Sequence, residues 1–316
     1  MPFQVLILIS AAPFATALKD ALTRAFPDLT VHVAANAVAA MPFIAATQGM
    51  LTIGSALTDE LLQSAERLVW IQSLGTGTDG IVDRPSLRRD VVVTNARGLF
   101  DDAVSECGIA LMLGLARNLP RLFQNQAARR WDFWTPVLLA GKSVGIIGLG
   151  AIGTTLARKC KALGMRVVGI SNRREAPDCD QITSYHQLVD TVRDLDFVVL
   201  VAALTPQTRG LIDRRVLAAM RSSSYLINLG RGAMVVEADL IAALRSGTIA
   251  GAALDAFVQE PLPEDSELWS APNVIISPHL AGPHDSHLEH VIKIIEQNIR
   301  ALRDGAPDSV VNVVQR

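Results

Sequence analysis

Short apolar runs alternate with amphipathic stretches through the first 98 residues. The runs have strand length and cover residues 3–9, 31–34, 50–54, 68–73 and 91–94. Between the first two runs, Phe14, Leu18, Leu22 and Phe26 recur every fourth residue, which is the apolar stripe of a helix. Continuous apolar strands that alternate with helices are typical of a parallel sheet covered on both faces. The pattern therefore predicts a small α/β unit over residues 1–98.

The same alternation resumes between residues 143 and 281. Strands are predicted at 144–147, 166–170, 197–201, 225–229, 250–254 and 274–277, and helices at 213–220 and 237–245. A long apolar helix is predicted over 101–118, ending near Pro120, and a final helix over about 284–302. This second region reads as one doubly wound sheet, so the chain is predicted to be an α/β protein with two parallel-sheet domains.

A glycine motif marks the start of the second sheet. Gly148, Gly150 and Gly153 follow the apolar strand 144–147 and precede a helical run, which is the context that a dinucleotide fingerprint needs. Gly148 permits a tight turn, Gly150 lets the backbone approach a pyrophosphate, and Gly153 lets helix and strand pack closely. The helix N-terminus, at Ala151 and Ile152, offers unpaired N–H groups to phosphates. The motif predicts a nucleotide cofactor.

The end of the next predicted strand indicates which nucleotide. NAD enzymes place an Asp or Glu about twenty residues past the glycines, on the ribose 2′-hydroxyl. Here the strand ends in Asn172, Arg173 and Arg174, and the first carboxylate is Glu175. Two guanidinium groups suit a 2′-phosphate. We therefore expect a preference for NADP(H), with NAD(H) possible; the alternative is that both arginines are ordinary solvated charges.

Polar groups follow three further strands. Arg231 follows strand 225–229, Asp255 and Glu260 follow strand 250–254, and His279 follows strand 274–277. An arginine grips a carboxylate, an imidazolium donates a proton, and a carboxylate orients that imidazole. Each residue alone has an ordinary surface or packing role. Together at successive strand ends, Arg231, Glu260 and His279 predict a catalytic trio for hydride transfer to a 2-keto acid.

Four stretches give the chain a specific resemblance. They are 141–153, 228–232 (NLGRG), 254–262 (LDAFVQEPL) and 277–282 (SPHLAG), and in order and spacing they resemble the D-2-hydroxyacid dehydrogenase family. The resemblance implies that Arg231 binds substrate, that Glu260 partners His279, and that His279 is the acid/base. It also implies that Asp255 contacts the nicotinamide carboxamide. The other residues that it places around substrate or cofactor are Leu74, Gly75, Thr76, Gly77, Thr205, Leu229 and Gly282.

The resemblance also implies an architecture and a reaction. Residues 1–98 with 284–316 form a flavodoxin-like substrate domain, and residues 99–283 form a Rossmann NAD(P)-binding domain, with a cleft between them. Members are usually homodimers. By analogy with such members, we expect reduction of glyoxylate or hydroxypyruvate by NADPH. Two alternatives stay open: the same scaffold acting on phosphite, formate or 3-phosphoglycerate, and a dinucleotide-sensing binding module without catalysis.

Composition narrows the class of partner. The formal net charge is -2, which gives no overall attraction to nucleic acid or to membrane surfaces. The 3 cysteines lack metal-ligand spacing and suit a reducing compartment. The apolar run 3–9 is short and has no preceding basic residue, so we expect a first strand, not a signal peptide, and a cytoplasmic protein.

Two segments have no assigned role. His284, His287 and His290 have helical spacing, for which we expect a solvated or interface face and no metal. The segment with Trp131 and Trp134 is either a surface loop with packed tryptophans or a substrate or interface element.

Overall fold

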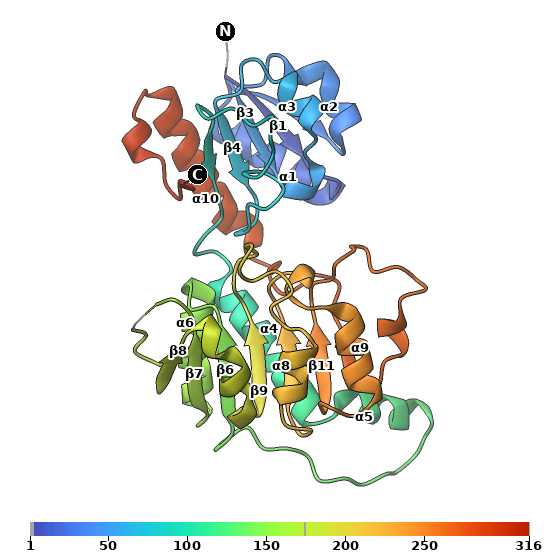
Figure 1. The fold of residues 1–316 in the computed structure, drawn as a ribbon. Helices are drawn as coiled ribbons and strands as arrows, with labels where there is room; N and C mark the ends of the chain where they lie inside the picture. Colours follow the sequence, from blue (N-terminus) through green and yellow to red (C-terminus); the bar gives the residue numbers. More distant parts are fainter. Residues whose placement is uncertain (1–2, 174, 316) are drawn as a thin grey trace. The chain divides into compact units, whose positions relative to one another are not determined.

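The computed structural model describes residues 3–173 and 175–315. The chain divides into two compact units: one comprises the chain up to Phe100 and again from His284, and the other runs from Asp101 to Pro283. Each unit is built around its own parallel sheet, coloured blue to cyan in the first and green to orange in the second (Figure 1).

The described residues of the first unit form a five-stranded parallel sheet of order β2-β1-β3-β4-β5. Its strands are β1 (Gln4–Leu8), β2 (Thr30–Ala34), β3 (Gly49–Thr52), β4 (Trp70–Ser73) and β5 (Val92–Thr94). Its helices are α1 (Ala12–Ala25), α2 (Ala37–Ile44), α3 (Asp59–Gln63) and α10 (His287–Arg303). This strand order is the flavodoxin-like one, as predicted.

Alternation along β1 divides the core of the first unit into two layers. Val5 and Ile7 pack with α1 and α10, whereas Leu6 and Leu8 pack with α2 and α3. Successive side chains of a strand point to opposite faces, so a strand that is buried on both faces is apolar throughout. Helix α10, red in Figure 1, therefore covers a sheet whose strands all lie in the first 94 residues of the chain.

The described residues of the second unit form a seven-stranded parallel sheet of order β12-β11-β10-β9-β6-β7-β8. Its strands are β6 (Ser143–Ile147), β7 (Arg166–Ile170), β8 (Gln181–Thr183), β9 (Phe197–Leu200), β10 (Tyr225–Asn228), β11 (Gly251–Leu254) and β12 (Val274–Ile276). Its helices are α4 (Asp101–Ala116), α5 (Leu119–Ala127), α6 (Ala151–Ala162), α7 (Leu188–Thr191), α8 (Arg214–Ala219) and α9 (Glu237–Arg245). The order reverses between β6 and β9, which makes this the predicted Rossmann topology.

Short 3₁₀ turns complete the assignment: η1 (Gly54–Ala56), η2 (Tyr185–Gln187), η3 (Val192–Asp194), η4 (Gly232–Met234), η5 (Glu267–Ser270) and η6 (Pro307–Ser309). No helix of the described residues has the length and apolar character needed to cross a membrane.

Helix α5 is the main element that the sequence did not predict. The helix predicted over 101–118 ends at Ala116, and Pro120, near which it was expected to end, lies in the first turn of α5, where a proline has no hydrogen bond to lose. Asn118 separates α4 from α5: it has φ = 54°, and its side chain accepts a hydrogen bond from the amide of Arg121. The last helix was also placed too early, because residues 284–286 form a turn before α10 begins at His287.

Candidate active site

The glycine motif forms a cradle at the end of β6. Gly148 has φ = 101°, and a Cβ there would lie 2.6 Å from Cα of Ala202. A Cβ on Gly153 would lie 1.9 Å from the carbonyl oxygen of Gly148, so α6 packs directly on the turn. A Cβ on Gly150, in contrast, would meet no atom within 4 Å, and no side chain of the described residues caps α6. The open position and the uncapped N-terminus fit a pyrophosphate.

The loop after β7 carries the residues expected at the ribose. Arg173 is exposed, and its amide donates to the hydroxyl of Ser171 at 3.2 Å. Asn172 donates to the side-chain oxygen of Gln207 at 3.5 Å, which connects this loop with the loop after β9. Arg174 lies outside the described residues.

Arg231 follows a closed turn at the end of β10. The Asn228 side chain accepts from the amide of Gly230 at 3.0 Å and donates to the carbonyl of Arg231 at 3.0 Å. Arg231 also donates to the carbonyl of Gly230 at 2.9 Å. The next residue, Gly232, has no room for a side chain, because its Cβ would lie 1.9 Å from the backbone of Phe257. The backbone after β10 is therefore packed on the backbone after β11.

Glu260 and His279 form a direct pair. His279 Nδ1 lies 2.8 Å from Oε2 of Glu260, and the other carboxylate oxygen accepts from the amide of Phe257 at 2.9 Å. A carboxylate only accepts, so Nδ1 carries the proton in this pair, and Nε2 is the ring nitrogen that does not contact Glu260. Both side chains are partly exposed. The pair has the geometry of an imidazole acid/base oriented by a carboxylate.

Asp255 is buried beside this pair, with 1% of its surface exposed. Its carboxylate accepts hydrogen bonds from Ser277, Leu280 and Ala281. These donors occupy three of the roughly four positions at which a carboxylate can accept. The expected contact of Asp255 with a nicotinamide carboxamide stays a prediction.

The remaining predicted residues are held in ordered loops. Thr205 accepts from and donates to Thr208 in a tight turn after β9, and buried Leu229 continues the ladder by donating to Leu200 at 3.0 Å. Gly282 is half-buried.

The loop 74–77 lies in the first unit. Ser73 donates to the carbonyl of Gly77 at 2.8 Å, and the Oγ1 atom of Thr76 is buried without a hydrogen-bond partner in the described structure.

The model of the D-isomer-specific 2-hydroxyacid dehydrogenase NAD-binding domain matches residues 109–281, which is more than half of the chain. The chain belongs to this family. It is therefore an NAD(P)-dependent oxidoreductase with the two-sheet fold of that family.

Named relatives agree with this assignment. The dehydrogenase is 32% identical to a glyoxylate reductase of Thermococcus litoralis over 264 residues, covering 80% of each chain. It is 32% identical to a D-3-phosphoglycerate dehydrogenase of Methanocaldococcus jannaschii over 82% of this chain but only 50% of that relative. A solved NADPH-dependent glyoxylate/hydroxypyruvate reductase of Sinorhizobium meliloti, in complex with NADP and sulfate, superposes with a TM-score of 0.86 at 27% identity, covering 99% of this chain and 98% of that one.

The sheet order of the dehydrogenase places the three predicted residues after neighbouring strands, and a contact joins two of them, Glu260 and His279. Arg231, Glu260 and His279 follow β10, β11 and β12, which are neighbours in the sheet and end at the same edge. Asn228 and Ser277 are not among the predicted site residues, although each shapes the turn beside a trio member. Each is the first residue of a stretch that carries the family resemblance, at 228–232 and 277–282, and this was the signal that could have found them.

The aromatic segment after α5 divides into two kinds of residue. Trp131 and Phe133 are 102% and 87% exposed, whereas Trp134 is half-buried beneath the guanidinium of Arg121, 4.7 Å from the ring centroid. Arg121 also forms an ion pair with Asp132 at 2.6 Å, which fixes the segment to α5. The interpretation of packed tryptophans therefore holds for Trp134 and is wrong for Trp131.

The three histidines also differ from one another. His287 is half-buried, with its ring 5.1 Å from those of Phe14 and Phe100, while His290 is exposed. Burial, followed by the neighbouring His284 and His290, lowers the pKa of His287 below its usual value. No cluster of the described residues has the donors in place for a metal ion. His290 is exposed, as expected for a solvated or interface face. His287 differs from the expectation, because its ring packs on Phe14 and Phe100.

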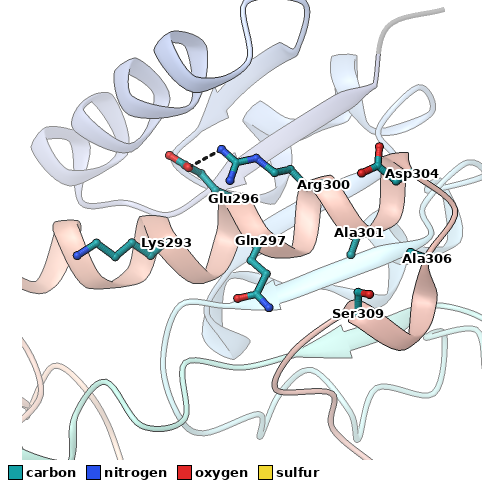
Figure 2. A pocket seen from close by; sticks show the side chains of 8 residues that line it. All are labelled: Lys293, Glu296, Gln297, Arg300, Ala301, Asp304, Ala306 and Ser309. Atoms are coloured by element: carbon teal, nitrogen blue, oxygen red, sulfur yellow. Dashed lines mark hydrogen bonds and ion pairs between the residues drawn. The ribbon is translucent and has the colours of Figure 1, made fainter.

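A depression on the first unit is lined by none of these residues. It runs along the C-terminal half of α10, where Glu296 and Arg300 form an ion pair at 3.0 Å (Figure 2). It contains none of the residues that the sequence predicted for substrate or cofactor, and we assign it no role.

Proposed function

We propose that this dehydrogenase reduces a small 2-keto acid of the glyoxylate or hydroxypyruvate type to the D-2-hydroxy acid, with NADPH as preferred cofactor. The observation that carries the proposal is the Glu260–His279 pair at 2.8 Å, next along the sheet edge to Arg231. The names of the Thermococcus and Sinorhizobium relatives support the same substrate class.

The chemistry follows from the roles of the trio. The nicotinamide cofactor, when bound, supplies the hydride to the carbonyl carbon of the substrate. The guanidinium of Arg231 binds the substrate carboxylate and polarises its carbonyl group. His279 donates the proton on Nε2 to the carbonyl oxygen, and Glu260 holds the imidazole through Nδ1 and stabilises its positive charge. Of the loop 74–77, the amides of Thr76 and Gly77 are proposed as further donors to the carboxylate, because the amide of Leu74 donates to Thr52 and that of Gly75 donates to Ser73.

The proposed NADPH preference depends on Arg173 and Arg174. The first is exposed at the carboxyl end of β7, beyond the glycine cradle, where a 2′-phosphate would be met. Arg173→Ser should raise the KM for NADPH by about 10-fold or more, because the charge-assisted hydrogen bond to the 2′-phosphate is lost. The KM for NADH, which has no 2′-phosphate, should not change. Arg166→Ser is the matched control, because Arg166 is an exposed arginine at the opposite end of the same strand. Equal effects on both cofactors would contradict the assignment.

The second candidate is another reaction on the same scaffold. The identity with the Methanocaldococcus phosphoglycerate enzyme favours 3-phosphoglycerate among these alternatives. A panel with glyoxylate, hydroxypyruvate, 3-phosphoglycerate, formate and phosphite separates the possibilities. A protein that binds NADPH but converts none of these compounds would act as the dinucleotide-sensing module.

We further propose a homodimer in the cytoplasm. The exposed aromatic segment is the candidate contact, since an exposed apolar patch fixed in place commonly marks an interface. Light scattering should give twice the monomer mass for the wild type and the monomer mass for the double variant Trp131→Ser, Phe133→Ser.

The free thiols of Cys107, Cys160 and Cys179 support the proposed location in the cytoplasm, and fractionation of producing cells tests it.

A further inference from the structure

The segment that carries His279 has an unusual backbone. Ser277 still belongs to the ladder, since its amide donates to Leu254 at 2.9 Å, but the chain then turns sharply, with the amide of His279 bonded to the carbonyl of Ser277 at 3.0 Å. His279 itself has φ = 56°, in the left-handed region that residues other than glycine rarely adopt. Surrounding contacts must hold such a conformation in place.

Those contacts converge on one buried carboxylate. Ser277 Oγ donates to Oδ1 of Asp255 at 2.5 Å, and the amide of Leu280 donates to the same oxygen at 2.8 Å. The amide of Ala281 donates to Oδ2 at 3.0 Å. The donors come from both sides of His279, so the carboxylate ties down the two ends of the turn that presents the imidazole.

We propose that Ser277 is a positioning residue for His279, acting through Asp255. The hydroxyl of Ser277 orients the carboxylate of Asp255, the carboxylate holds the amides of Leu280 and Ala281, and the turn keeps Nδ1 of His279 at Glu260. The consequence for catalysis rests on the proposed function, in which His279 donates the proton. The hydrogen bonds themselves do not depend on it.

Ser277 is a cleaner probe of this arrangement than Asp255. The carboxylate is the expected partner of the nicotinamide, so changing it would alter cofactor binding as well as the turn. Ser277→Ala removes one donor and leaves the carboxylate and both amides in place. Ser277→Thr keeps the hydroxyl, and the half-buried position tolerates an added methyl group.

The first measurement is independent of activity. Hydrogen exchange of the whole protein should show the amides of Leu280 and Ala281 exchanging about 10-fold faster or more in Ser277→Ala than in wild type, because the turn opens more often. Ser277→Thr should exchange like wild type. Ser270→Ala is the control, because Ser270 is exposed in the same unit and, among the described residues, its hydroxyl bonds only the carbonyl of Glu267. Unchanged exchange in Ser277→Ala would overturn the proposal.

The second measurement is kinetic. Ser277→Ala should lower kcat for 2-keto acid reduction by about 10- to 100-fold through a displaced imidazole, while the KM for the keto acid stays within about 3-fold, since Arg231 lies on another loop. Ser277→Thr should restore kcat, and the affinity for NADPH, measured by fluorescence, should not change. Loss of kcat in both variants, or loss of NADPH binding alone, would overturn the positioning role. If the wild type reduces no 2-keto acid, the proposed function fails, and the exchange result still decides the role of Ser277 in the turn.

Discussion

Replacing Gly232 by alanine tests whether the packing of two loops sets the geometry of the trio. Gly232 directly follows Arg231 and is buried. A Cβ there would lie 1.9 Å from the carbonyl carbon of Phe257, 2.2 Å from its oxygen and 2.3 Å from the amide nitrogen of Val258. All three are backbone atoms, so no side-chain rotation relieves the overlap.

The size of the effect follows from these distances. Carbon atoms pack at about 3.5 Å, so the two loops must separate by about 1.5 Å at this point. The amide of Phe257 holds Glu260, and Arg231 is adjacent to the new methyl group, so the separation moves the two functional groups relative to each other. A misplacement of about 1 Å costs on the order of 10²-fold in rate, and overpacking costs about 1–3 kcal/mol of stability.

The assay compares kcat/KM and thermal stability in Gly232→Ala and Gly247→Ala. Gly247 has φ = 68° with open space around it, so alanine there costs about 1 kcal/mol of stability through backbone strain without displacing either loop. We expect about a 10²-fold loss of kcat/KM in Gly232→Ala and wild-type kinetics in Gly247→Ala. A Gly232→Ala variant with kcat/KM within about 3-fold of wild type would refute the reasoning.

Three further predictions concern single side chains. His279→Ala should lower kcat by about 10²–10⁴-fold, because the general acid is lost, and near-normal turnover would contradict that role. Burial, followed by the charge of Asp255, raises the pKa of the Cys107 thiol to about 11. At pH 8, iodoacetamide should therefore alkylate Cys107 about 100-fold more slowly than a thiol with the ordinary pKa of 9.0. Rapid labelling of Cys107 would contradict this prediction. The pKa of His287 is lower in the folded protein than its ordinary value of 6.5. As the pH falls below about 6.5, the unfolded chain therefore binds a proton on His287 before the folded protein does, and the folded protein loses stability relative to the unfolded chain. His287→Phe should therefore lose less thermal stability between pH 7 and pH 5 than wild type, and an equal loss would argue against this account.

Strand periodicity predicted most of the fold because both sheets are buried on two faces. The runs of Val, Ile and Leu in β6, β9 and β10 are stable only in the interior of a sheet that is covered on both faces. Because the strands are parallel, their carboxyl ends then lie at one edge of the sheet. That is why the three polar residues after β10, β11 and β12 could be predicted to lie at one edge of the sheet. Helix α5 was missed for a local reason, because the left-handed backbone of Asn118 separates the two helices and Pro120 then lies in the first turn of α5.

The support for the trio was not readable from the sequence. Ser277 and Asp255 are 22 residues apart, and their hydrogen bond exists only because β11 and β12 pair in one register. The left-handed backbone of His279 likewise carries no local signal, since histidine has no preference strong enough to predict it. Exposure of Trp131 was equally unpredictable, because an apolar side chain by itself does not say which surface it meets.

The central claim is most directly tested by following the absorbance of the nicotinamide while NADPH and NADH are each offered with the panel of 2-keto acids. We expect glyoxylate or hydroxypyruvate to oxidise NADPH, and to oxidise it faster than NADH. The His279→Ala variant should lose this activity. No oxidation of either cofactor by any 2-keto acid would contradict the central claim.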